Sequence, residues 1–169
     1  MSGRRRETPG AIEIRDARPD DFPVMSSVYR RASLANERDR DNLLADPAHL
    51  ELSDAAARPG RSLVAVIDGR VIGFASIDPV EHALELDALF VDPDWMRHRA
   101  GTALVAAVAE RARDLGLSTV TVSANFHALA FYRHAGFIET GLVELEFGPA
   151  PRLVLYVSLA GVERPDLPT

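Results

Sequence analysis

The segment VDPDWMRHRAGTALV, residues 91–105, brings a cluster of basic side chains to the start of a helical pattern. Arg97, His98 and Arg99 directly precede that pattern. Backbone N–H groups in the first turn of a helix lack intrahelical partners and carry the positive end of the helix dipole, so they suit a phosphate. Arginine adds a planar fork that matches phosphate oxygens. We therefore expect this loop to contact phosphate, although Arg99 stands where such loops usually carry glycine.

The arginine at position 99 leaves two outcomes open. In one outcome the side chain turns outward in an allowed backbone conformation, and the backbone amides alone bind phosphate. In the other, the loop no longer binds phosphate. The basic cluster could also be a solvated loop, or could pair with Asp92 and Asp94 within the chain. We favour phosphate contact because the cluster stands out in a chain of net charge −6.

Residue types that the chain lacks exclude several kinds of chemistry. It has no cysteine, which rules out disulfides, thiolate nucleophiles and cysteine zinc sites. All 19 basic residues are arginine, so there is neither a Schiff-base lysine nor a Walker-type phosphate lysine. The 5 histidines form neither an HExxH pair nor a carboxylate cluster at ligand spacing, and we expect no metal site.

Length and composition indicate one ordinary globular domain. The 169 residues are 47% hydrophobic and 26% charged, which suffices for a single buried core. The net charge of −6 argues against nonspecific nucleic-acid binding, so we expect a small partner. No apolar stretch approaches the roughly 18 residues that span a bilayer, and the amino-terminal MSGRRRETPG lacks a secretory signal. We expect a cytoplasmic protein without membrane contact.

The first half of the chain predicts one helix and several strands. Asp68-Gly69 between two β-rich runs is a strong signal for a hairpin turn. Pro93 follows the last strand of this half and blocks its continuation. Clustered charges and prolines leave residues 36–60 undetermined. The predicted elements are a strand at 12–17, a helix from 19 to about 34, and strands at 61–67, 70–77 and 83–91.

The second half predicts a long helix, a strand, a short helix and a final strand pair. Steps of mostly four residues place Leu104, Val108, Ala112 and Leu115 on one helical stripe that ends at Gly116. The remaining elements are a strand at 118–124, a helix at 127–135, and strands at 137–147 and 151–159. Together these elements predict an α/β or α+β sheet with helices on its faces. The domain should cover residues 11–160, between disordered tails at 1–10 and 161–169.

Three consecutive segments, ALELDALFVDP, WMRHRAGTALV and SANFHALAFYRHAGF, resemble bacterial members of the GNAT superfamily of acyl-CoA-dependent N-acyltransferases. The resemblance covers about residues 12–158 in element order and is most specific from 85 to 137. AFYRHAGF matches the family closely. The family's phosphate loop, Gln/Arg-x-x-Gly-x-Gly/Ala, agrees with residues 96–101 only at Gly101.

This resemblance implies a fold and an activity. The fold is a single-domain, mixed but mostly antiparallel sheet of about seven strands with helices on both faces. The activity is that of an acetyl-CoA-dependent N-acetyltransferase, which moves an acetyl group to a primary amine of a small molecule or peptide by direct attack in a ternary complex.

The resemblance assigns the proton acceptor of this reaction to Glu85. An ammonium must lose a proton before its nitrogen attacks the thioester, and a carboxylate can take that proton directly or through water. Asp87 lies two residues further on, hence on the same face of the strand, so the two could share or divide the task. Both could instead be polar residues on a solvated sheet face.

Tyr132 and Asn125 are the other side chains with implied roles. In the family the tyrosine protonates the departing coenzyme A thiolate, which a phenol can do. Its apolar neighbours Leu129, Phe131 and Phe137 fit a core aromatic as well. Asn125 resembles an asparagine that contacts coenzyme A or orients the tyrosine, but a helix cap would also explain it.

The resemblance also implies where acetyl-CoA lies. The strand at residues 89–91 splays from its neighbour and bulges, which admits the pantetheine arm and presents a backbone N–H to the oxyanion. The cofactor-binding residues implied are Leu89, Phe90, Val91, Met96, Arg97, His98, Arg99, Ala100, Gly101, Thr102, Asn125 and Tyr132.

Selectivity for the amine acceptor is expected from the first helix, residues 36–60 and the last hairpin. Arg152 at a strand start could clamp a carboxylate or form only an outer salt bridge. Carboxylates that could draw a cationic amine, though such groups are more often merely solvated, are Glu37, Asp39, Asp41, Asp46, Glu139, Glu144 and Glu146.

Two alternatives from other classes are open. The glycine-poor loop is compatible with a catalytically weak or inactive sensor that binds coenzyme A on the same fold. The chain could also be a purely interacting domain. The resemblance also allows a homodimer, because members of the family often form one, although no stretch of the sequence specifies it.

Overall fold

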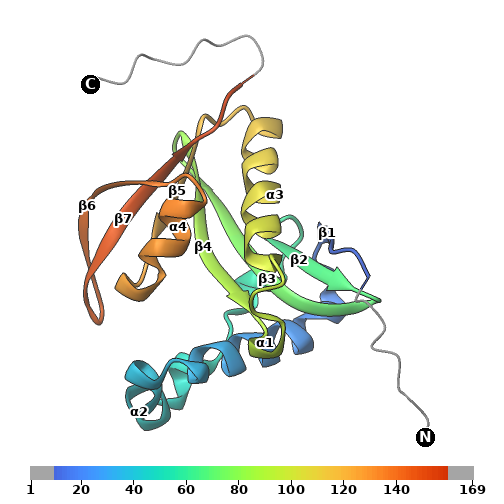
Figure 1. Ribbon diagram of the computed structural model, residues 1–169, viewed down its shortest axis with the longest axis vertical. Coiled ribbons are helices and arrows are strands. Elements are labelled where there is room, and N and C mark those ends of the chain that lie inside the picture. Colours follow the sequence, from blue (N-terminus) through green and yellow to red (C-terminus); the bar gives the residue numbers. More distant parts are fainter. Residues whose placement is uncertain (1–9, 160–169) are drawn as a thin grey trace, which may run out of the picture.

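The computed structural model describes residues 10–159 and contains one sheet of seven strands (Figure 1). Their spatial order is β1-β2-β3-β4-β5-β7-β6, and all neighbouring pairs are antiparallel except β4 and β5. The predicted mixed, mostly antiparallel sheet is confirmed. Except for Gly10, the predicted tails at 1–10 and 161–169 lie outside the described residues. The strands are β1 Glu13–Asp16, β2 Ser62–Ile67, β3 Arg70–Val80, β4 Ala83–Val91, β5 Thr119–Ser123, β6 Ile138–Leu145 and β7 Gly148–Tyr156.

Helices cover both faces of the sheet, as expected. They are α1 Phe22–Ala35, α2 Glu37–Ala45, α3 Ala100–Asp114 and α4 Leu129–His134. The undetermined segment 36–60 forms α2 and two 3-10 turns, Pro47–Leu50 and Asp54–Ala57. Asn36 begins α2, because its side chain accepts a hydrogen bond from a backbone N–H of the first turn.

Two separate apolar cores hold these helices on the sheet. On one face, Leu104 and Val108 of α3 are fully buried together with Leu84 of β4. On the opposite face, Met25 of α1 is fully buried together with Phe74 of β3. Fully burying such a side chain stabilises a fold by about 1.5–3 kcal/mol. The two faces of β4 are therefore covered by different helices.

The helical stripe predicted for α3 is right for three of its four members. Leu104, Val108 and Ala112 are each 0% exposed, whereas Leu115 is 51% exposed. The difference arises because the helix ends at Asp114, so that Leu115 is its C-terminal cap and turns away from the sheet.

The hairpin predicted at Asp68-Gly69 is confirmed between β2 and β3. Asp68 has φ 49° and Gly69 has φ 77°. Positive φ at both central residues is the type I′ pattern, which matches the twist of two neighbouring strands.

Two irregularities of β4 shape the centre of the sheet. Ser76 of β3 pairs with Ala88 but Ile77 pairs with Leu86, so Asp87 is an extra, bulged residue. The bulge was expected at residues 89–91, and it lies two residues earlier, at Asp87. β5 pairs with β4 only at Leu84 and Glu85. Beyond Glu85 the two strands separate, and Figure 1 shows β6 and β7 diverging from β2 and β3.

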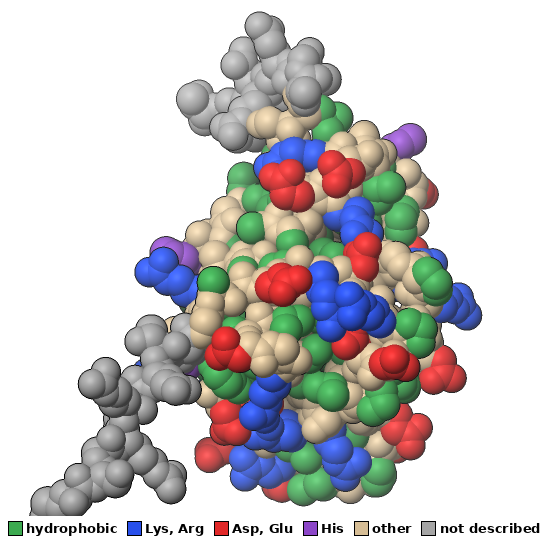
Figure 2. Space-filling view, turned by 90° about the vertical axis from the view of Figure 1, so that its right-hand side faces the viewer, with side chains coloured by type: hydrophobic (Ala, Val, Ile, Leu, Met, Phe, Trp, Pro, Cys, Tyr) green, Lys and Arg blue, Asp and Glu red, His purple; other side chains and the backbone are tan. Residues whose placement is uncertain are grey.

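Charged side chains of both signs are interspersed on the face shown in Figure 2, without an extended patch of one sign. Some opposite charges form ion pairs, such as Arg15 with Asp21 at 2.7 Å and Arg133 with Glu139. Asp21 is buried, whereas the Arg133–Glu139 pair is exposed, and exposed pairs add only about 0–1 kcal/mol each. The stability of the fold therefore rests mainly on its two apolar cores.

Candidate active site

The loop between β4 and α3 keeps a glycine-like backbone although arginine occupies it. Arg97 has φ 67° and Arg99 has φ 63°, both in the left-handed region that favours glycine. Arg99 is the N-terminal cap of α3, yet its exposed side chain makes no capping hydrogen bond. Arg99 thus adopts the allowed left-handed backbone conformation that the sequence left open, and its side chain is exposed at the rim of the loop.

The start of α3 leaves amides available to a ligand. The first bond of this helix runs from the N–H of Ala103 to the carbonyl of Arg99. The N–H groups of Ala100, Gly101 and Thr102 therefore precede the intrahelical ladder. The 15-residue helix adds the positive end of its dipole at the same place.

The acidic residues beside this loop are engaged elsewhere. Arg31 of α1 donates to Asp92 at 2.7 Å and to Asp94 at 2.9 Å. Among the ion pairs of residues 10–159, none involves Arg97 or Arg99. The alternative in which the loop arginines neutralise Asp92 and Asp94 is therefore wrong. Nothing in the sequence pointed to Arg31.

A hollow of about 560 Å³ opens beside the loop, and we call it the loop hollow. Its lining is Leu89, Val91, Trp95, Met96, Arg97, Arg99, Ala100, Gly101, Thr102, His127 and Phe131. Most residues expected to bind the cofactor thus meet in one place. His98, Asn125, Tyr132 and Phe90 are not in this lining, and the Phe90 side chain lies on the other face of β4.

Glycine at position 101 is favoured by close packing rather than by its backbone angle. A Cβ atom at this position would lie 3.2 Å from the ring of Phe131 on α4. Glycine therefore lets α4 approach the start of α3, and Phe131 closes one side of the loop hollow. Phe131 was not among the predicted site residues, although the motif AFYRHAGF contains it.

The edge of β4 that faces β5 presents free backbone groups. The N–H of Asp92 donates to the carbonyl of Ile72 on the β3 side at 2.7 Å. Because N–H direction alternates along a strand, the N–H groups of Leu89 and Val91 point to the opposite side. There β5 has already separated from β4. These are two of the three residues at which an oxyanion donor was expected.

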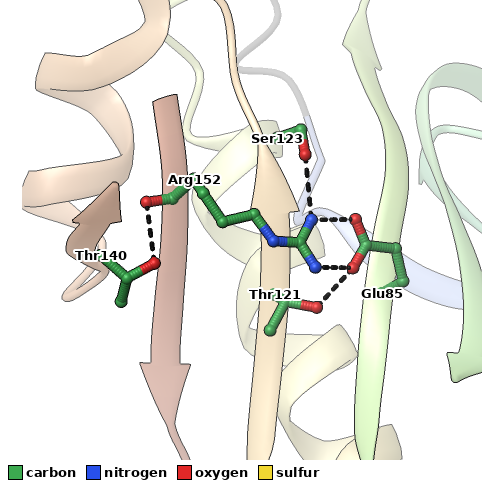
Figure 3. Close-up of polar contacts among 5 residues, drawn as sticks. All are labelled: Glu85, Thr121, Ser123, Thr140 and Arg152. Carbon is green, nitrogen blue, oxygen red and sulfur yellow. Dashed lines mark hydrogen bonds and ion pairs between the residues drawn. The ribbon is translucent and has the colours of Figure 1, made fainter. Parts of the chain in front are cut away.

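Glu85 and Arg152 form a bidentate ion pair across the sheet (Figure 3). The two guanidinium nitrogens donate to the two carboxylate oxygens at 2.5 Å and 2.6 Å. Thr121 donates to one of these oxygens, and Arg152 also donates to Ser123 at 2.9 Å. Hydrogen bonding to Glu85 raises the pKa of Arg152. Arg152 therefore forms a salt bridge within the chain, which is partly buried rather than exposed, and its guanidinium is taken up by Glu85 instead of being free for a carboxylate of the acceptor.

Asp87 lies at the bulge on the same side of the sheet as Glu85. Its side chain is exposed and lines a second hollow of about 500 Å³, on the α1 face, which we call the α1-face hollow. Partial burial raises the pKa of Asp87, and the negative charges of Glu85 and Asp78 raise it further, while Arg61 opposes them. The seven carboxylates suggested as amine attractors do not line this hollow.

Tyr132 is buried at 7% exposure between Phe131 and Phe137, with ring centroids 5.2 Å and 5.3 Å away. Burial raises the pKa of Tyr132 to about 12. The phenol therefore keeps its proton across the physiological range. Asn125 begins a 3-10 turn, but its exposed side chain makes no capping hydrogen bond. Side-chain capping does not explain this asparagine.

Within residues 10–159, no group of three or more His, Asp or Glu side chains could hold a metal ion. Over the same residues, no helix is both long and apolar enough to cross a membrane.

Comparison with known proteins places this arrangement in a family. The profile of the acetyltransferase (GNAT) family matches residues 14–137. The uncharacterized N-acetyltransferase YafP of Escherichia coli is 28% identical over 130 residues, which cover 75% of this chain and 81% of YafP.

Solved structures share the fold at lower identity. A GCN5-related N-acetyltransferase from Rhodopseudomonas palustris has a TM-score of 0.68 and 22% identity, covering 89% of this chain and 98% of that one. The PaiA N-acetyltransferase from Thermoplasma acidophilum, in complex with coenzyme A, has a TM-score of 0.66 and 17% identity, covering 86% and 99%. Through its sequence match, this chain belongs to the GNAT family of acetyltransferases.

Proposed function

We propose that this chain transfers the acetyl group of acetyl-CoA to a primary amine of a small molecule or peptide, by direct attack in a ternary complex. One observation carries the proposal. The loop hollow, with arginines and free helix amides, and the α1-face hollow, with Asp87, lie on opposite faces of β4. The free edge of β4 beyond Glu85 lies between them.

The residues of the loop hollow fit coenzyme A. The N–H groups of Gly101 and Thr102 and the side chains of Arg97 and Arg99 suit its phosphates. The backbone edge at Leu89 and Val91 suits the amide-rich pantetheine arm, which can bind as an added strand. Acetyl-CoA supplies the activated acetyl group.

The chain's own groups then handle protons and charge. A carboxylate of β4 takes a proton from the acceptor ammonium, so that its nitrogen can bond to the acetyl carbon. The N–H of Leu89 or Val91 donates to the carbonyl oxygen. Tyr132 supplies a proton to the departing thiolate, a role supported by a pKa of about 12 that keeps the phenol protonated.

A second candidate is a sensor that binds coenzyme A without turnover. The observation in its favour concerns the two residues with an implied catalytic role. Glu85 is ion-paired with Arg152, and the side chain of Tyr132 is buried in the core. The enzyme is preferred because Asp87 is exposed beside the free strand edge.

Thermal shift and thiol release together test this function. Acetyl-CoA at about a hundredfold its Kd should add roughly 2.7 kcal/mol, which is several degrees in Tm. The shift should be smaller with 3′-dephospho-CoA. Thiol release that depends on an added amine identifies the enzyme, and a shift without such release identifies the sensor. No shift with any of these ligands contradicts both. The chain has no lysine, so acetylation of its own lysines cannot contribute to product.

A further inference from the structure

Glu85, the carboxylate implied by resemblance, is held by a fixed positive charge. Both of its oxygens accept from Arg152, and one also accepts from Thr121. Its side chain is 17% exposed, and that of Arg152 is 29% exposed. To reach an amine, Glu85 would have to give up hydrogen bonds that charge on both partners strengthens.

Asp87 is differently placed. As the bulged residue of β4, it leaves the β3 ladder and projects into the α1-face hollow. Among the described residues, its carboxylate takes part in no hydrogen bond or ion pair. A carboxylate without partners at the mouth of a hollow is available to a ligand.

The charges that face Asp87 come from several elements. Arg61 and Asp78 form an ion pair with each other, so they nearly cancel. Glu85 is paired with Arg152, although its negative charge still raises the pKa of Asp87. The remaining charged groups of the hollow are Glu51 and Arg58, both exposed. Asp87 therefore adds one net negative charge, which suits an acceptor with a single ammonium.

Another part of the lining of this hollow is aromatic and preformed. The rings of Tyr29 and Phe90 meet edge to face, with centroids 4.8 Å apart. The Tyr29 hydroxyl donates to the carbonyl of His49 at 2.9 Å, which fixes the ring. Leu52 and Ala88 extend this apolar wall. A volume of about 500 Å³ lies in the range of small-molecule sites.

We propose that Asp87 accepts the proton of the acceptor, and that the acceptor is a small primary amine with one positive charge and an apolar, preferably aromatic, group. This inference rests on the proposed acetyl transfer. In the reaction the amine nitrogen bonds to the acetyl carbon as the carbon–sulfur bond of the thioester breaks. The ammonium proton passes to Asp87, and the sulfur leaves with the bonding electrons and takes a proton from Tyr132. The acylated nitrogen then loses its second proton, directly or through water, to the Tyr132 phenolate, and Asp87 releases its proton to solvent.

The decisive experiment is a pH profile of kcat/KM for phenethylamine at saturating acetyl-CoA. Asp87→Asn should lower kcat/KM by on the order of a hundredfold or more and remove the acidic limb of the profile. Glu85→Gln should keep that limb and cost less than tenfold. If Glu85→Gln removes the limb and Asp87→Asn keeps it, the assignment to Asp87 is overturned.

One further variant and one further measurement guard against misfolding. The double variant Glu85→Gln/Arg152→Gln replaces the ion pair by neutral amides and should also keep the acidic limb. Asp87→Asn should retain the full thermal shift with acetyl-CoA, because the residue lies on the acceptor side of β4. A lost limb in the double variant, or a lost shift in Asp87→Asn, would contradict the proposal.

The proposed substrate class is tested by comparing kcat/KM for amines that differ in charge and in aromatic character. The wild-type chain should favour phenethylamine over putrescine, which carries two charges and no aromatic group, by about tenfold or more in kcat/KM. Phe90→Leu should raise KM for phenethylamine more than for methylamine. Equal or better use of putrescine contradicts the proposed class of aromatic monoamine acceptors.

If no amine reacts but acetyl-CoA still shifts Tm, the chain is the sensor. If the shift also fails, the proposed cofactor binding is wrong.

Discussion

Arg31 of α1 binds Asp92 through a hydrogen bond of 2.7 Å that spans 61 residues of sequence. Asp92 is 4% exposed and follows directly after β4. Its other carboxylate oxygen accepts from the N–H of Asp94 at 3.0 Å. The first helix thus fixes the beginning of the loop, and Arg97 and Arg99 are left without acidic partners in the described chain.

Replacing Arg31 by alanine should weaken coenzyme A binding by on the order of tenfold, because the loop loses its anchor and its amides lose their alignment. Titration calorimetry with coenzyme A measures the change. Arg30→Ala is the matched control, since Arg30 is exposed and has no ion pair among the described residues. Equal affinity in the Arg31 and Arg30 variants would show that the loop holds its shape without α1.

Arg99→Gly should stabilise the fold and weaken cofactor binding at once. A side chain in the left-handed region costs roughly 1 kcal/mol, and its removal should raise Tm by about 2–4 °C. The loss of a positive charge should lower coenzyme A affinity several-fold.

Glu81→Gly is the control for this change in stability. Glu81 has φ 51° and lies away from the loop hollow, so glycine there should raise Tm without changing affinity. Unchanged affinity in Arg99→Gly would mean that the amides alone bind the phosphates.

A double-mutant cycle at Glu85 and Arg152 should show a coupling energy of about 1–3 kcal/mol in urea unfolding. Each single glutamine variant leaves a partly buried charge without its partner. The double variant removes both charges and should recover most of the lost stability. Additive losses would show that the pair contributes nothing beyond its separate residues.

Local sequence signals predicted the helices and strands of this fold. Contacts between residues far apart in the sequence determine which side chains of the candidate site are paired and which are exposed. Asp68-Gly69 predicted a turn because both residues accept positive φ, and that preference needs no tertiary partner. The pair of Glu85 with Arg152 joins residues 67 apart, and no periodicity of either strand indicates it. Period-two alternation did place Asp87 beside Glu85, but the bulge that exposes Asp87 depends on the register with β3.

Replacing Asp87 by asparagine should stabilise the fold at neutral pH. The raised pKa of Asp87 means that its ionised form is less favourable in the folded chain than in the unfolded chain. This cost is fully present above the raised pKa and disappears as pH falls below the ordinary value for aspartate. Tm of both proteins, measured from pH 4 to 8, should therefore converge toward the acid end. A variant less stable than wild type at pH 7 would contradict the pKa shift.

Tyr132→Phe should lower kcat by about tenfold to a hundredfold while Tm changes little, because no described hydrogen bond holds the hydroxyl. With a pKa of about 12, the tyrosine should add no limb to the rate profile below pH 10. Steady-state kinetics with a saturating amine gives the comparison. An unchanged kcat would make Tyr132 only a core aromatic.

The separation of β5 from β4 gives the cofactor-free sheet an internal edge in addition to β1 and β6 at its ends. Open strand edges are templates for pairing with other chains. Coenzyme A bound along Leu89 and Val91, as proposed above, would cover this edge and reduce its availability for pairing with other chains.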